Sequence, residues 1–129
     1  MNIRILISIL FVFLLSYVGM ASAQVVITDL SKIELLSDHS SIKAGDSFNI
    51  VIELEPNEGW HAYWVNPGDA GLKLEVAWDL PEGVEVGELQ FSTPHLIPFE
   101  EIVSYGYDGK VTVTAEVKTP DNFESSQLT

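Results

Sequence analysis

The chain has no cysteine and few basic residues, and both shortages narrow its possible functions. Its 129 residues include 6 Lys or Arg against 19 Asp or Glu, so the formal charge is −13. Without cysteine it can form no disulfide, no thiolate metal site and no thiol nucleophile. A strongly acidic chain also lacks the cations that displace counterions from phosphates, which argues against nucleic acid as a partner. The composition still favours a folded domain, because 47% of the residues are hydrophobic and disordered acidic segments are poor in such residues.

The amino terminus has the pattern of an export signal. Arg4 precedes an apolar run from Ile5 to Val18, and the small residues Ala21-Ser22-Ala23 follow it, as at a signal-peptidase site. This pattern predicts a cleavable signal peptide over residues 1–23 and one domain over residues 24–129, located in the periplasm or otherwise outside the cytoplasm. The run is shorter than the roughly 20 residues that span a bilayer, so the mature chain is expected to contain no membrane span. A retained amino-terminal anchor is the alternative.

Short strands separated by turns dominate the rest of the sequence. Apolar and polar residues alternate over 47–55, 72–79 and 110–118, and a period of two is typical of half-buried strands. Weaker strand patterns cover 33–36, 60–65, 84–91 and 102–107. Asp108-Gly109 and Pro81-Glu82-Gly83 are predicted to be hairpin loops. Short strands at this spacing predict an all-β fold, an immunoglobulin-like antiparallel β-sandwich.

An aromatic cluster within one predicted strand is the strongest candidate for an interaction surface. Trp60, His61, Tyr63 and Trp64 lie close together, and a turn-rich segment over 66–71 follows them. Alternation places the two Trp residues on the core face, where a sandwich needs large side chains, and His61 with Tyr63 on the opposite face. The alternative is that the whole cluster binds a peptide or a glycan. The residues of the predicted surface are His61, Tyr63, Asn66, Asp69, Tyr105 and Tyr107.

The placement of the last two tyrosines depends on register. If Asp108-Gly109 closes a two-residue hairpin, Ser104 and Gly106 face inward and leave little side-chain volume there. Either a bulge near Gly106 turns one of the tyrosines inward, or both aromatic rings pack on the outer face.

No pattern predicts a metal, a cofactor or a catalytic centre. The three histidines, His39, His61 and His95, are 22 and 34 residues apart, which matches no local ligand spacing. The acidic residues lie in predicted turns or at outward strand positions, where a solvated charge is the ordinary case. No nucleophile elbow or phosphate-binding loop is present. We therefore expect no catalytic, metal-binding or cofactor-binding residues.

Several segments together resemble a known family. They are residues 33–38, residues 44–48, and the string W-H-A-Y-W-V-N-P-G-D-A-G-L over 60–72. They resemble the amino-terminal periplasmic domain of DsbD/ScsB-type thiol:disulfide interchange proteins, a protein-disulfide reductase family. Residues 78–83 and 105–109 follow in the order found in that family, so the resemblance extends over about 33–120.

The resemblance implies an immunoglobulin-like periplasmic domain that works with a membrane-embedded redox domain and with periplasmic protein partners. In the family, such domains take part in disulfide reduction, cytochrome c maturation and, in the ScsB branch, copper tolerance. The chain departs from the family at one decisive point. The redox Cys pair of the family lies beyond the strand that matches 110–118, and this chain has no cysteine. Thiol–disulfide exchange needs a thiolate nucleophile, so no catalytic residue can be carried over to this chain.

Two functional hypotheses follow. In the first, the chain is part of a disulfide reductase, truncated at its carboxyl end before the cysteines, because residues 119–129 show no strand pattern where the family continues into further strands. This hypothesis predicts an incomplete sandwich of marginal stability. In the second, the chain is a stand-alone, non-redox immunoglobulin-like binding module. In both, the acidic charge favours basic or neutral partners.

Overall fold

The computed structural model describes residues 23–124 and 126–127, and within them the chain forms β-strands and no helix. The predicted signal peptide lies outside this part of the chain apart from Ala23, where the first strand begins. The strands are β1 (Ala23–Ile27), β2 (Ser31–Ser37), β3 (Ser41–Ile42), β4 (Ser47–Pro56), β5 (Ala62–Gly68), β6 (Glu85–Val86), β7 (Gln90–Phe91), β8 (His95–Phe99), β9 (Ile102–Tyr107), β10 (Val111–Lys118) and β11 (Ser126–Gln127).

The main sheet has the strand order β1-β2-β4-β10-β6, with β7 also paired to β10, and its ladders are antiparallel. At its centre β4 pairs with β10, so that Phe48 lies opposite Val117. The alternation predicted over 47–55 and 110–118 is confirmed, because Phe48, Val111 and Val113 are at most 4% exposed.

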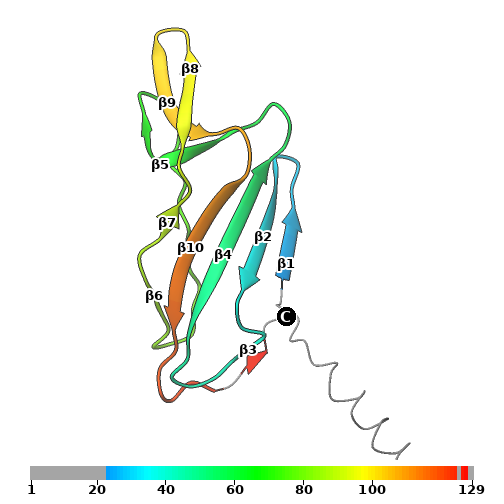
Figure 1. Ribbon diagram of the computed structural model, residues 1–129, viewed down its shortest axis with the longest axis vertical. Coiled ribbons are helices and arrows are strands. Elements are labelled where there is room, and N and C mark those ends of the chain that lie inside the picture. The colour runs from blue at the N-terminus through cyan, green and yellow to red at the C-terminus, as the bar shows by residue number, and fades with distance from the viewer. Residues whose placement is uncertain (1–22, 125, 128–129) are drawn as a thin grey trace, which may run out of the picture.

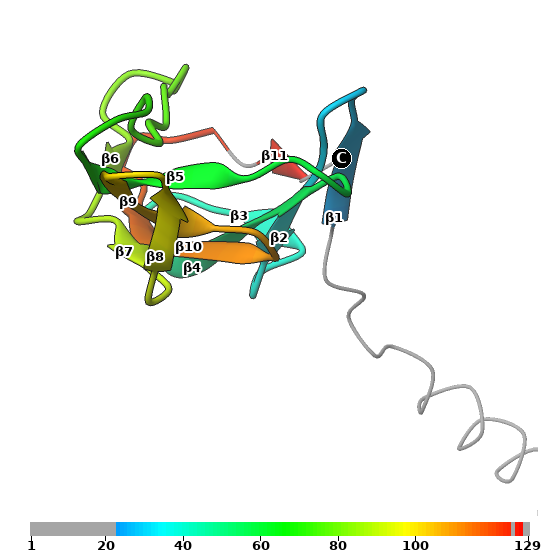
Figure 2. The same ribbon diagram turned by 90° about the horizontal axis from the view of Figure 1, so that it is seen from above.

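A second, three-stranded sheet has the order β5-β9-β8 and is also antiparallel. In Figure 2, β5 lies over the main sheet as a second layer. Figure 1 shows that the β8–β9 hairpin projects beyond the end of the main sheet, while β3 and β11 form a small antiparallel pair at the opposite end. The predicted all-β, immunoglobulin-like sandwich is therefore the observed fold class.

Two clusters of buried side chains fill the space between the layers. The first consists of Ile42, Phe48, Ile50, Ala115 and Val117, and the second of Tyr107, Val111 and Val113. Leu89 packs against both clusters. It lies in a bulge: Val86 pairs with Val117 and Phe91 with Val113, so the β6–β7 edge has one residue more than β10 between these pairs.

The prediction of a hairpin at Asp108-Gly109 is wrong. The strands that flank it do not pair, because β9 pairs with β5 and β8 while β10 pairs with β4, β6 and β7. The loop carries the chain from the small sheet to the main sheet, as connections between the layers of a sandwich do. The two tyrosines before it have different environments: Tyr107 is 3% exposed and Tyr105 is 39% exposed.

The prediction of a strand over 72–79 is also wrong. Alternation is present, since Leu74 and Val76 are half-buried while Lys73 and Glu75 are exposed. Ladder pairing in this described segment, however, is limited to one isolated parallel bridge between Lys73 and Tyr63. Leu74 packs against the second core cluster, whereas Leu72 is 89% exposed, and the segment forms no ladder beyond this bridge. Alternation alone therefore identified the buried face but not the hydrogen-bonding partner.

The turn at Pro81-Glu82-Gly83 forms as predicted, but it closes no hairpin. Gly83 has a φ of 82°, and the Val84 amide donates to the Pro81 carbonyl at 3.2 Å. The residues before the turn are not a strand, and the predicted strand over 84–91 is divided into β6 and β7.

A hydrogen-bonded carboxylate links the end of β2 to β4. Asp38 Oδ1 accepts from the Asn49 amide at 2.9 Å and Oδ2 accepts from Asn49 Nδ2 at 3.0 Å, and Oδ1 also lies 2.9 Å from His39 Nδ1. Desolvation by itself would raise the pKa of Asp38, but the hydrogen bonds together outweigh it and hold this pKa below its usual value of 3.8.

This lowered pKa predicts acid sensitivity with a definite sign. A carboxyl whose pKa is lower in the folded state stabilises the fold above its unfolded-state pKa, and that contribution is lost as the pH falls through the folded-state pKa. We expect Asp38→Asn to lower the free energy of unfolding at pH 7 and to flatten its fall between about pH 5 and pH 2. Urea unfolding of both proteins at a series of pH values measures this effect. Identical pH profiles would contradict it.

Candidate functional site

The predicted aromatic strand is β5, an edge strand of the small sheet. Ala62 pairs with Tyr107 and Tyr63 with Gly106, and the next pair, Gly68 with Ser104, follows a shift of register. Between the last two pairs β5 advances further along the chain than β9, so its residues 64–67 bulge.

Two glycines allow β5 and its loop to lie this close to β9. A methyl group on Gly106 would overlap the carbonyl oxygen of Ala62, and one on Gly68 would lie 2.7 Å from the carbonyl oxygen of Val103. Gly68 also has a φ of 84°, which favours glycine. Because the clashing atoms belong to the backbone, no side-chain rotation could relieve them.

His61 and Tyr63 lie together and form a hydrogen bond. Nε2 of His61 is 2.9 Å from the Tyr63 hydroxyl, and the two rings meet edge to face with centroids 4.9 Å apart. Gly71 lies against the Tyr63 ring: its φ is 104°, and a Cβ there would be 2.6 Å from three ring carbons. The glycine two positions after Asp69 therefore makes room for the tyrosine.

These side chains border a cavity of about 220 Å³ between β5, its loop and the β8–β9 hairpin. The cavity is lined by His61, Tyr63, Ala70, Ile97, Pro98, Phe99, Ile102 and Ser104. Its wall is apolar apart from the His61–Tyr63 pair and Ser104. The Ser104 side chain is buried and donates to the Ala70 carbonyl at 2.9 Å, so its hydroxyl is already engaged. The arrangement suits the binding of an apolar group that carries a polar atom.

The hairpin beside the cavity exposes apolar side chains. Phe99 is 69% exposed, Leu96 57% and Ile102 42%. Phe99 pairs with Ile102, so Glu100 and Glu101 form the loop between the two strands. An exposed apolar patch with polar residues at its rim is a common feature of protein-binding surfaces.

Of the other predicted surface residues, Tyr105 belongs to β9, Asn66 lies in the bulge of β5, and Asp69 follows β5 directly. Asp69 accepts from the Val103 amide through Oδ2 at 2.9 Å, and its own amide donates to the Val103 carbonyl at 3.0 Å, so it fastens the loop to β9. Asn66 and Tyr105 are exposed, and the Tyr105 ring lies against Trp64 with centroids 6.4 Å apart.

The assignment of Tyr107 to the surface needs correction. Its side chain is 3% exposed, and its hydroxyl donates to the Ser92 carbonyl at 2.7 Å. Burial raises the pKa of this hydroxyl. Tyr107 therefore belongs to the core, where it joins β9 to the chain before β8.

Of the two Trp residues predicted for the core, one packs there. Trp64 is half-buried and packs against the second core cluster, whereas Trp60 is 53% exposed. Trp60 precedes β5 and lies in a turn in which its amide donates to the Asn57 carbonyl at 2.9 Å. The alternation of the strand therefore does not extend back to it.

This difference predicts unequal effects of the two truncations. Trp64→Ala should lower the free energy of unfolding by about 2–3 kcal/mol, below the ~3–5 kcal/mol of a fully buried ring. Trp60→Ala should change it by less than about 0.5 kcal/mol, because most of that ring already contacts solvent. Urea unfolding of the two variants measures the difference, and equal losses would show that the faces of this segment are misassigned.

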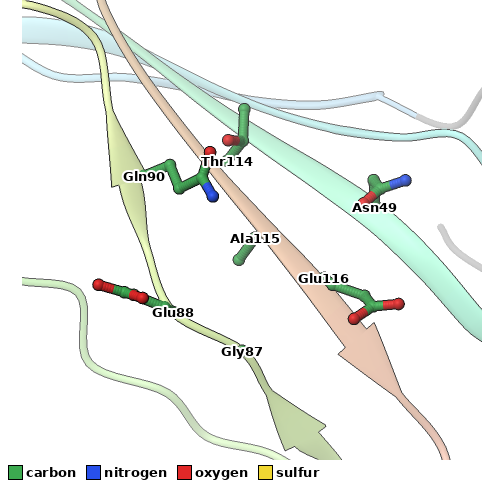
Figure 3. Close-up of a pocket in the computed structure, with 7 residues that line it drawn as sticks. All are labelled: Asn49, Gly87, Glu88, Gln90, Thr114, Ala115 and Glu116. Atoms are coloured by element: carbon green, nitrogen blue, oxygen red, sulfur yellow. The ribbon is translucent and has the colours of Figure 1, made fainter.

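A second hollow, of about 270 Å³, lies between β10 and the β6–β7 edge. Figure 3 shows Asn49, Gln90, Thr114 and Glu116 along it. The Glu116 carboxylate accepts a hydrogen bond from Ser47 Oγ and lies 3.6 Å from Lys118 Nζ. This hollow is less apolar than the cavity beside β5, and its carboxylate is already engaged.

The three histidines lie apart, each with a partner of its own. His39 Nδ1 is 2.9 Å from Asp38, His61 Nε2 is 2.9 Å from Tyr63 and His95 Nε2 is 3.2 Å from Asp108. Within the described part of the chain, no three His, Asp or Glu side chains gather as a metal site would require.

The sequence prediction missed the hairpin side of the cavity. Ile97, Phe99 and Ile102 line it, but β8 was not predicted, because Pro94 and Pro98 interrupt the apolar run. Pro98 is compatible with β8 because this strand lies at an edge of the small sheet. The apolar residues between the two prolines were the available signal.

Comparison with known proteins assigns the family. The family described as thiol:disulfide interchange protein DsbD, N-terminal, matches residues 34–129, which is more than half of the chain. No curated protein and no solved structure matches the chain. Over the described residues, no helix is long and apolar enough to cross a membrane. The chain therefore belongs to the family of the DsbD amino-terminal domain.

Proposed function

We propose that the chain is an extracytoplasmic docking domain of a thiol:disulfide interchange system. The surface formed by β5, β8 and β9 receives the redox partner. The observation that carries the proposal is the cavity beside His61 and Tyr63, which combines an apolar wall, a hydrogen-bonding pair and an exposed apolar hairpin. Family membership supplies the context of disulfide chemistry.

The chain contributes binding and positioning to this system, and thiol chemistry comes from elsewhere. It contains no cysteine, and the nucleophile in disulfide exchange is a thiolate. The exchanging cysteines therefore lie outside these 129 residues, on a membrane-embedded redox domain or a periplasmic protein partner. Disulfide reduction, cytochrome c maturation and copper tolerance are the family roles in which such docking would serve.

The charge of the chain indicates the surface that the partner presents. The chain has 19 acidic and 6 basic residues, and Glu100 and Glu101 form the tip of the exposed hairpin. A partner with basic residues around an apolar contact fits this surface, and its affinity should fall as salt screens the attraction.

A stand-alone, non-redox binding module is the second candidate. The exposed rings of Trp60 and Tyr105 favour it, because aromatic side chains with one polar atom serve both peptide and glycan recognition. The two candidates differ in whether a thioredoxin-like domain binds at all.

Phe99→Ala is the variant that tests the docking surface. We expect it to weaken binding of the thioredoxin-like domain of a DsbD-family protein about tenfold, because exposed aromatic anchors dominate such interfaces. Ile27→Ala removes an apolar side chain that is 78% exposed on β1 and should leave the affinity unchanged. Titration calorimetry at low salt measures both variants. Equal affinities of Phe99→Ala and the wild type would contradict the proposed surface, and a complete lack of binding would favour the stand-alone module.

A further inference from the structure

The loop between β9 and β10 combines the groups that an aspartate needs to rearrange its own backbone. Residues 108–110 carry the chain from one strand to the other (Figure 1), and they contain the only Asp-Gly pair of the sequence. Gly109 has no Cβ, so no side chain shields its amide nitrogen from the carboxyl group of Asp108. Each of the other aspartates is followed by a residue with a side chain.

Both reacting groups of this pair are accessible in the folded chain. The side chain of Asp108 is 81% exposed. A Cβ at Gly109 would have nothing within 4 Å, so the space around the glycine is open as well. Within the part of the chain that the structure describes, the Gly109 amide donates no hydrogen bond. It is therefore free to approach the carboxyl group of the residue before it.

Other aspartates of the chain have one of these two groups engaged. Asp29 and Asp38 precede amides that already donate hydrogen bonds. The Leu30 amide donates to a threonine hydroxyl at 3.2 Å, and the His39 amide donates to a serine hydroxyl at 3.1 Å. The Asp69 carboxylate accepts from a backbone amide of β9 at 2.9 Å. Asp108 differs from these three in having an exposed carboxyl group and a free amide directly after it.

We propose that Asp108 is a site of spontaneous isoaspartate formation in the folded protein. The Gly109 nitrogen attacks Cγ of the protonated Asp108 carboxyl group, and the new C–N bond closes a five-membered succinimide ring. The Cγ–OH bond breaks, and the hydroxyl leaves as water with the proton of the Gly109 nitrogen. A water molecule then opens the ring at the main-chain carbonyl carbon of Asp108, so that the chain continues through Cγ. The reaction needs only water and no oxidant or reductant.

The rearrangement changes the loop in two ways. It adds the Cβ atom to the backbone, and it leaves a shorter carboxylate attached directly to Cα. His95 Nε2 lies 3.2 Å from Asp108 Oδ1, and the shorter carboxylate should lose this contact at the first residue of β8. Tyr107 and Val111 are at most 3% exposed, so the core holds both ends of the loop and the change stays within 108–110. The inference does not depend on the proposed function.

Incubation of the purified chain at neutral pH measures the reaction. Isoaspartate is quantified by methyl transfer from protein isoaspartyl methyltransferase, and it is located by digestion with endoproteinase Asp-N, which does not cleave before isoaspartate. Asp79 is the internal control, because it is also exposed but is followed by Leu80. Since a following Cβ hinders the attack, we expect isoaspartate at 108 to accumulate at least about tenfold faster than at 79. The imidazole NMR signals of His95 should shift over the same time course.

Gly109→Ala is the matched variant, because it adds one methyl group where the structure leaves open space. It should slow isoaspartate formation at 108 at least about tenfold, and circular dichroism verifies that it folds. A parallel incubation of the wild type in urea gives the rate in the unfolded chain. Isoaspartate at 108 no faster than at Asp79, a rate unchanged in Gly109→Ala, or formation confined to the urea sample would each overturn the proposal.

Discussion

Gly106→Ala is expected to lower the free energy of unfolding by about 2–4 kcal/mol. The added methyl group would overlap the Ala62 carbonyl oxygen and lie 3.0 Å from Cδ1 of Ile97. Ala62 and Tyr63 form the two pairs that join β5 to β9 before the bulge, so relief of the clash requires the two strands to separate. A loss of this size is a large part of the ~5–15 kcal/mol that stabilises a small domain.

Gly109→Ala is the matched control for this change. A Cβ at Gly109 would have nothing within 4 Å, and its φ is not in the left-handed region. We expect a change of less than about 0.5 kcal/mol in the free energy of unfolding. Urea unfolding of the two variants compares the same substitution three positions apart. Similar stabilities of the two variants would show that β5 does not approach β9 as closely as described.

Phe48→Ala is expected to lower the free energy of unfolding by about 3–5 kcal/mol. Phe48 is 4% exposed and belongs to the first core cluster, opposite Val117. Removal of its ring leaves a cavity that the paired β4 and β10 backbones cannot close. Phe99→Ala, at 69% exposure, should change the free energy of unfolding by less than about 0.5 kcal/mol.

The two phenylalanine variants therefore separate stability from binding. Calorimetric unfolding should show a large effect at Phe48 and almost none at Phe99, while Phe99→Ala should weaken partner binding about tenfold in a chain that remains folded. If Phe99→Ala destabilised the domain as much as Phe48→Ala, the hairpin would be part of the core and its role in docking would be refuted.

The parts of the fold that could be predicted from the sequence are those in which a local pattern determines burial. Alternation identified β4 and β10, because each strand buries its apolar residues on one face of the main sheet and directs its polar residues to the other face. The same reasoning correctly placed Leu74 against the core but wrongly assigned its segment to a strand. A period of two reports which side chains are buried, whereas a strand also needs a backbone partner that lies far away in sequence.

Long-range pairing is also why Asp108-Gly109 was misread. The dipeptide favours a tight hairpin locally, but β9 has two partners within the small sheet, and β10 lies at the centre of the main sheet. The residues of the loop do not indicate that other strands compete for pairing with β9 and β10. The strand β8 was missed for a different reason, since Pro98 weakens a strand pattern although it is compatible with an edge.

About half of the candidate site could be predicted. Alternation placed His61 and Tyr63 together, and the structure joins them by a hydrogen bond. The structure also explains two glycines of the 60–72 string, because Gly68 lies against the β9 backbone and Gly71 lies against the Tyr63 ring. The hairpin side of the cavity, with Phe99, depends on the pairing of β8 with β9, which no local pattern near the aromatic cluster indicates.

The most direct test of the docking proposal is NMR chemical-shift mapping of the labelled chain. The probe is the thioredoxin-like domain of a DsbD-family protein with its cysteines replaced by serine, added at low salt. The account predicts shifts concentrated at His61, Tyr63 and Phe99, and in Phe99→Ala about a tenfold higher probe concentration should be needed to produce those at His61 and Tyr63. Shifts confined to the outer face of the main sheet, or none at saturating concentration, would contradict it.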